Sequence, residues 1–343
     1  MDIIVRKNSL LRCAGSHENQ TLLLLPGFAD NGTMFMGLFD TPLADRFRLI
    51  AVDLPGFESS PRDADIGTLH DYGAYVADLA TDVAPNRPVG IVGHSVASII
   101  AVLACERLQR RAAGLFSIEG ILTSSDAYFS GNAAEHADPS TFKTAFLEDV
   151  WARVHAQPIL RRYHSSVMMA DSVSMWQLGN NAKRMSAVDQ PGQQLLALKS
   201  RKLYYWSPVN TPDTTRQWIE AHPQLPSRQF HNASHWPTVD QPIETARAMF
   251  DFFEQAQKSL LGLFDLFPDA LSWKGSIGKR PLWVKMRVMV TATPRPLFIR
   301  LPTIHNISSK YSMSRVQARL QATVVKNRNS HRNHYTPVED GKG

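Results

Sequence analysis

Apolar runs alternate with amphipathic stretches along the first 120 residues of the chain. Thr21–Leu25 is a continuous apolar run that ends at Pro26-Gly27, as expected for a strand buried on both faces. The same reasoning predicts further strands over residues 47–52, 89–93 and 114–118. Helical spacing of apolar residues predicts helices over about 33–45, 69–83 and 97–108. This alternation is typical of the α/β class, a mostly parallel sheet with helices on both faces.

The pattern changes in the middle of the chain, between about residues 122 and 199. Strand signals vanish there, and Ala, Met, His and Trp recur at spacings compatible with helices. Strand character returns over residues 202–206 and 228–231, and a last amphipathic helix is predicted over about 241–256. We therefore predict a helical cap inserted between two parts of one core: core 1–122, cap 123–199 and core 200–257.

The remaining residues, 258–343, have a different charge from the rest of the chain. They contain 15 Lys and Arg against 4 Asp and Glu, a net charge of +11, whereas the whole chain carries +6 and the first 257 residues therefore carry −5. We predict a basic, disordered extension. Its charge favours only weak, non-specific contact with polyanions, and no nucleic-acid-binding motif is present.

Composition narrows the class of protein further. The chain is 43% hydrophobic and 20% charged, which is ordinary for a globular protein, and its two cysteines exclude a disulfide framework. The N-terminus lacks the apolar core of a secretory signal, and no apolar run reaches the length of about 18–20 residues needed to span a bilayer. These features predict a cytoplasmic protein without a transmembrane segment.

One pentapeptide carries the clearest chemical signal. Gly93-His94-Ser95-Val96-Ala97 lies where a predicted strand turns sharply into a predicted helix. A nucleophile elbow needs this context, because a strained turn then presents the serine hydroxyl above the sheet. Small residues are needed on either side of the serine, and Gly93 and Ala97 meet that need. The alternative is that Ser95 only caps the helix.

Three further segments join this pentapeptide in a resemblance to the α/β-hydrolase superfamily, over residues 20 to about 257. They are Leu25-Pro26-Gly27-Phe28, Asp53-Leu54-Pro55-Gly56-Phe57 and Ala233-Ser234-His235-Trp236-Pro237. The resemblance implies Ser95 as the nucleophile and His235 as its general base. It also implies an oxyanion hole formed by the backbone N–H groups of Phe28 and Val96. His231 is the alternative to His235.

The acid that completes the triad is left open by the sequence. The family usually places an Asp after the seventh strand, where this chain has Asn210, and an amide cannot offset the charge of an imidazolium. Asp213, three residues further on, is one candidate. Glu119, at the end of the predicted strand 114–118, is the preferred one, because some family members take their acid from that strand. The alternative is that Glu119 only braces the cap.

The resemblance predicts a serine hydrolase that cleaves a small, apolar acyl ester through an acyl-enzyme intermediate. No nicotinamide fingerprint or P-loop is present, and the histidine spacing in the cap, as between His155 and His164, matches no standard metal motif. We therefore expect no cofactor and no metal. Two alternatives stay open: a non-catalytic binding or signalling protein on the same fold, and hydrolysis of carbon–carbon or amide bonds by the same triad.

Overall fold

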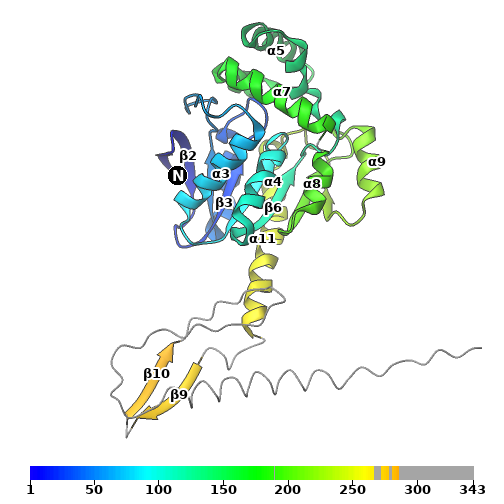
Figure 1. Ribbon diagram of the computed structural model, residues 1–343. Coiled ribbons are helices and arrows are strands. Elements are labelled where there is room, and N and C mark those ends of the chain that lie inside the picture. Colours follow the sequence, from blue (N-terminus) through cyan, green and yellow to red (C-terminus); the bar gives the residue numbers. More distant parts are fainter. Residues whose placement is uncertain (189, 266–271, 278–279, 286–343) are drawn as a thin grey trace, which may run out of the picture. The chain divides into compact units, whose positions relative to one another are not determined.

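The computed structural model describes residues 1–188, 190–265, 272–277 and 280–285, with side chains through residue 254. The chain divides into two units, residues 1–266 and residues 267–343. The first unit contains an eight-stranded sheet and the helices around it (Figure 1). The described part of the second unit is a two-stranded antiparallel hairpin of β9 (Ser272–Ile277) and β10 (Arg280–Lys285).

The large sheet is mostly parallel. Its strand order is β1-β2-β4-β3-β5-β6-β7-β8; the pairs from β4 to β8 are parallel, and β2 pairs antiparallel with both β1 and β4. The strands are β1 (Asp2–Arg6), β2 (Ser9–Ala14), β3 (Gln20–Leu25), β4 (Phe47–Val52), β5 (Val89–His94), β6 (Ala112–Ile118), β7 (Lys202–Trp206) and β8 (Ser227–Gln229). Every residue of β4 and β5 is buried, which explains why both strands consist of apolar residues and glycine apart from Arg48 and His94.

Helices pack on both faces of this sheet. On β5, a Cβ added to Gly93 would meet Ala97 and Ala101 of α4 (Ala97–Leu108). A Cβ added to Gly90 would instead meet Phe253 of α11 (Pro242–Asp265). Because residues three apart in a strand point to opposite faces, α4 and α11 cover opposite sides of the sheet. Helix α3 (Leu69–Val83) lies beside α4 (Figure 1).

The inserted residues between β6 and β7 are helical. The helices are η3 (Ser124–Tyr128), η4 (Ser130–Glu135), α5 (Pro139–Arg153), α6 (Ile159–Met169), α7 (Ser172–Val188) and α8 (Pro191–Ala197). The described residues of this interval contain no strand, as the sequence predicted. Helix α5 packs against both α6 and α7, and Figure 1 shows α5 and α7 beyond one end of the sheet.

Most predicted elements of the first unit match the structure, and one predicted helix is wrong. The interval 33–45 holds three short elements, η1 (Gly32–Phe35), α1 (Met36–Phe39) and α2 (Leu43–Arg46), instead of one helix. Pro42 lies inside the predicted helix and lacks the N–H that a continuous helix requires, so α2 starts after it. The antiparallel hairpin of β1 and β2 was not predicted.

The C-terminal boundary also differs from the prediction. Helix α11 continues to Asp265, and β9 and β10 are paired, so the expectation of disorder from residue 258 onward is wrong for these segments. For residues 266–271, 278–279 and 286–343 that expectation lies outside the described residues. No helix in the described ranges is both long and apolar enough to cross a membrane. Short helices α9 (Asp213–Ala221) and α10 (Pro237–Asp240) complete the first unit.

Candidate active site

Ser95 lies at the turn between β5 and α4, as predicted. Its backbone φ is +54°, in the left-handed region that residues other than glycine rarely adopt. Its N–H donates to the Ile118 carbonyl at 2.9 Å, which ties the turn to the end of β6. Val96 is the N-cap residue of α4, and no side chain caps that helix. The alternative that Ser95 only caps the helix is therefore wrong.

Two glycines allow the close approaches around this turn. A Cβ on Gly93 would lie 2.6 Å from the Ala97 carbonyl oxygen, so only glycine fits where strand and helix meet. A Cβ on Gly27 would lie 2.6 Å from Nδ1 of His94 and 3.1 Å from Cβ of Ser95. The loop that follows β3 therefore runs directly against the serine turn.

The two predicted oxyanion donors lie on this loop and on the turn. Phe28 and Val96 are both buried, and neither N–H makes a hydrogen bond within the described part of the chain. Most buried backbone N–H groups in proteins are paired. Two buried donors beside one half-buried serine can therefore donate hydrogen bonds to a substrate oxygen.

Glu119 and His235 contact each other, although 116 residues separate them. Glu119 directly follows β6 with a φ of +47°, and its side chain is 3% exposed. One carboxylate oxygen accepts from the Ser207 N–H at 2.6 Å, and the other lies 3.3 Å from Nδ1 of His235. A carboxylate at this nitrogen can fix the imidazole tautomer that leaves Nε2 free to take a proton. No hydrogen bond from this carboxylate to the inserted helices is present among the described residues.

The other acid candidate and the alternative histidine lie elsewhere. The Asp213 side chain is 78% exposed and pairs with Arg216, so the structure does not bring it to His235. Asn210 donates from its amide to the Ala233 carbonyl at 3.3 Å, which braces the histidine loop without touching the ring. His231 is exposed and lines a separate hollow with Arg228 and Glu244.

His94 is part of the site, and the sequence analysis gave it no role. Its Nε2–H donates to the His235 carbonyl at 2.7 Å, and the two rings lie 4.7 Å apart. Complete burial is the larger cause and the nearby His235 the smaller one that together lower the pKa of His94 to about 3. The ring is therefore neutral at ordinary pH. The only available signal was its place inside the pentapeptide, next to the serine.

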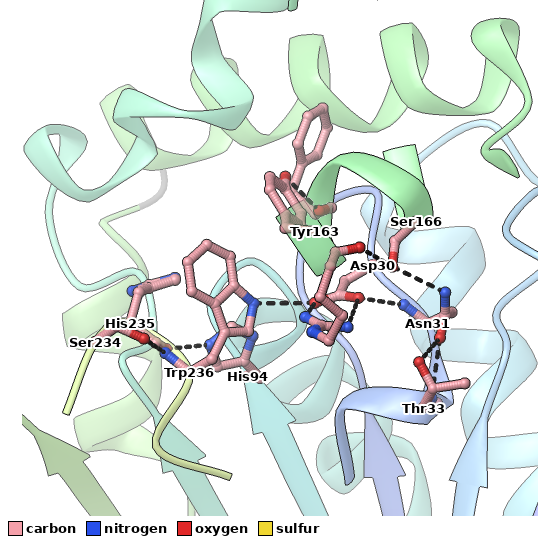
Figure 2. A network of polar contacts seen from close by, with 12 residues as sticks. Asp30, Asn31, Thr33, His94, Tyr163, Ser166, Ser234, His235 and Trp236 are labelled. Carbon is pink, nitrogen blue, oxygen red and sulfur yellow. Dashed lines mark hydrogen bonds and ion pairs between the residues drawn. The ribbon is translucent and has the colours of Figure 1, made fainter. Parts of the chain in front are cut away.

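Asp30 is the second residue that the sequence analysis missed. It is 2% exposed, and Trp236 donates to it from Nε1 at 2.9 Å, as Figure 2 shows. Arg162 of α6 forms an ion pair with it at 2.7 Å. Burial by itself would raise the pKa of Asp30, but Arg162 and the hydrogen bonds bring it below its ordinary value. A buried ionised carboxylate thus connects three segments of the site.

Ser95 and His235 are linked through His94 and share no direct bond among the described residues. Among the described residues no hydrogen bond joins the Ser95 hydroxyl to the His235 ring; the link runs through His94, adjacent to one and packed on the other. Catalytic hydrogen bonds of free enzymes are often long and tighten only with substrate. Within the same residues, no three His, Cys, Asp or Glu side chains gather as a metal site.

Solved structures with the same fold cover most of the chain. A thermophilic esterase from Thermogutta terrifontis matches with a TM-score of 0.58 and 16% identity, over 72% of this chain and 93% of its own. A putative aryl esterase from Burkholderia cenocepacia matches with a TM-score of 0.58 and 15% identity, over 73% and 95%. A hydrolase from Pseudomonas aeruginosa PA01 matches with a TM-score of 0.57 and 18% identity, over 73% and 97%.

Sequence comparison gives the family. No curated protein sequence matches the chain. The family model described as "Alpha/beta hydrolase family" matches residues 22–248, a range that begins in β3, ends in α11 and contains every site residue described above. The protein therefore belongs to the alpha/beta hydrolase family.

Proposed function

We propose that this chain is a serine hydrolase that cleaves a small acyl ester with Ser95, His235 and Glu119 as its triad. The observation that carries the proposal is the contact of the buried Glu119 carboxylate with Nδ1 of His235, 3.3 Å away. Asn210, in place of the usual acid, was the reason to consider a non-catalytic protein. A carboxylate from β6 removes that reason, because it supplies the charge that Asn210 lacks.

The proposed first half-reaction forms an acyl-enzyme. Ser95 Oγ attacks the acyl carbonyl carbon while its proton passes to Nε2 of His235. The N–H groups of Phe28 and Val96 stabilise the charge that develops on the carbonyl oxygen, and each such donor contributes ~10²-fold or more. The intermediate then collapses, and the alcohol leaves with the proton held by His235.

The second half-reaction restores the enzyme. His235 takes a proton from water, and the resulting hydroxide attacks the acyl carbon bound to Ser95. Collapse of this intermediate releases the carboxylic acid, and the proton on His235 returns to the serine oxygen. Glu119 accepts from Nδ1–H throughout and offsets the charge of the imidazolium.

Two observations support an ester substrate with an apolar part. Aromatic rings surround the imidazole: Trp236 lies 5.3 Å from His235, and the exposed Tyr128 lies 6.5 Å from it, both edge-on. Two of the structural neighbours are described as an esterase and a putative aryl esterase. Hydrolysis of carbon–carbon or amide bonds has no comparable support in the side chains around His235.

The test uses p-nitrophenyl esters of graded acyl length. Ser95→Ala should lower turnover by at least ~10³-fold without changing the fold, because the nucleophile is lost. Ser124→Ala, which removes an exposed hydroxyl from η3, is the matched control and should turn over like wild type. A fluorophosphonate probe should label the wild type and the control but not Ser95→Ala. An unlabelled wild type would instead support the non-catalytic alternative.

A further inference from the structure

One face of helix α6 contacts the loop that carries Phe28. Arg162 donates from its two terminal nitrogens to the two carboxylate oxygens of Asp30, at 2.9 and 2.7 Å. The hydroxyl of Tyr163 donates to the Phe28 carbonyl at 2.8 Å. The loop is therefore bonded to the inserted helices at the proposed oxyanion donor and two residues after it.

A third contact follows one residue further along the same loop. Asn31 donates from its side-chain amide to Ser166 Oγ of α6 at 3.0 Å, and Figure 2 shows this bond beside Asp30. Ser166 lies one helical turn from Arg162, so these side chains share one face of α6. Three side chains within little more than one turn of α6 thus bond one short loop, which leaves that loop little freedom to move independently of the helix.

Asp30 extends this connection to the histidine loop. Its Oδ2 accepts from Arg162 and also from Nε1 of Trp236, the residue that follows His235. One buried carboxylate thus joins helix α6, the oxyanion loop and the loop of the general base. Removal of Arg162 would leave this buried charge without its counter-ion, so the carboxylate must move toward water or toward its remaining donors.

We propose that Arg162 is a positioning residue for hydrolysis: through Asp30 it holds the Phe28 N–H at the place where the oxyanion forms. This inference rests on the proposed function. An oxyanion donor acts only within about 2.7–3.1 Å of the oxygen, so a small displacement of the loop removes most of its effect. A paired, planar guanidinium fixes both the distance and the orientation of the carboxylate, which a single charge does not.

The experiment compares Arg162→Met, Arg162→Lys and the matched control Arg161→Met. Arg161 is the exposed neighbour on the same helix. For Arg162→Met we expect kcat to fall by ~10²-fold with KM within about threefold of wild type, because misplacement acts on the transition state. Arg162→Lys keeps a charge but not the paired geometry, so its kcat should lie between the kcat of wild type and that of Arg162→Met. Arg161→Met should match wild type.

A second readout separates positioning from a merely structural role. A trifluoromethyl ketone that adds to Ser95 forms the oxyanion itself, so its affinity should fall in parallel with kcat/KM. Lower stability alone would reduce the amount of folded enzyme, which active-site titration with the fluorophosphonate corrects. If Arg162→Met does not fold, kcat and ketone affinity of Arg162→Lys test the positioning role instead.

The outcomes distinguish this inference from the proposed function. If wild type shows Ser95-dependent turnover and both Arg162 variants keep wild-type kcat and ketone affinity, the positioning role is refuted and the hydrolase proposal stands. An effect confined to KM also refutes it. If wild type shows no Ser95-dependent turnover or labelling, both proposals are overturned together.

Discussion

The serine turn and the histidine loop reach the same site by different means. Backbone geometry holds Ser95: a left-handed φ of +54°, an N–H bonded to β6, and glycine at the point of closest approach. Side chains from distant segments hold His235: His94 bonds its carbonyl, and Glu119 bonds its ring. The turn of the proposed nucleophile is thus set mainly by its own backbone, whereas the loop of the proposed base is held by side chains from distant segments.

This difference separates the expected effects of substitutions. Changes at the turn should act first on folding, because they disturb a strained backbone buried between strand and helix. Changes in the contacts of His235 should act first on turnover or on its pH range, because the loop itself lies near the surface.

The largest effect is expected at the ring of His235. Glu119→Gln keeps the size of the side chain but removes the charge that stabilises the imidazolium, so kcat should fall by about 10³–10⁴-fold. Urea unfolding should show that the variant is folded. Asp213→Asn is the control for the rejected acid, whose side chain is 78% exposed, and its kcat should stay within about twofold of wild type. The reverse ranking of these variants would assign the acid to Asp213.

The second effect is a loss of stability at the turn. An Ala at position 93 would place its Cβ 2.6 Å from the Ala97 carbonyl oxygen, so strand and helix must separate. We expect Gly93→Ala to lower the free energy of unfolding by about 1–3 kcal/mol, measured by urea denaturation. In Gly67→Ala the new Cβ has its nearest neighbour at 3.6 Å, and the change should be within about 0.5 kcal/mol. Equal stability of the two variants would contradict the tight packing of the turn.

The third effect concerns acid stability and His94. Its pKa is lowered to about 3 in the folded protein, whereas an unfolded histidine binds a proton below about pH 6.5. The stability from keeping this ring neutral is therefore complete above about pH 6.5 and is lost as the pH falls toward 3, by at most about 1.4 kcal/mol per pH unit.

The variant that tests this is His94→Gln, which can still donate to the His235 carbonyl but does not titrate. Urea unfolding between pH 7 and pH 4 should show a shallower loss of stability than in wild type. Asp30 also contributes to acid sensitivity in both proteins, because its pKa is lowered, so the difference between the curves is the measured quantity. Parallel curves would show that His94 takes no part in the acid response.

The family resemblance implies the backbone donors at Phe28 and Val96. The sequence alone determined the strands β3 to β7 and the serine turn. These follow from short-range physics: apolar runs, the steric freedom of Gly93 and the turn from strand to helix are all set by neighbours in the chain. The interval 33–45 shows the limit of this reasoning. Its apolar spacing predicted one helix, but Pro42 interrupts it and the structure has three short elements there.

Only the tertiary structure decided which acid meets the histidine and which residues support the loops. The sheet order sets β6 between β5 and β7, so Glu119 comes to lie between the serine turn and the N–H of Ser207, 88 residues away in the chain. Asp30 and Arg162 meet across 132 residues. Such pairings depend on which strand ends and helix faces become neighbours, and no local pattern around Glu119, Asp30 or Arg162 encodes that.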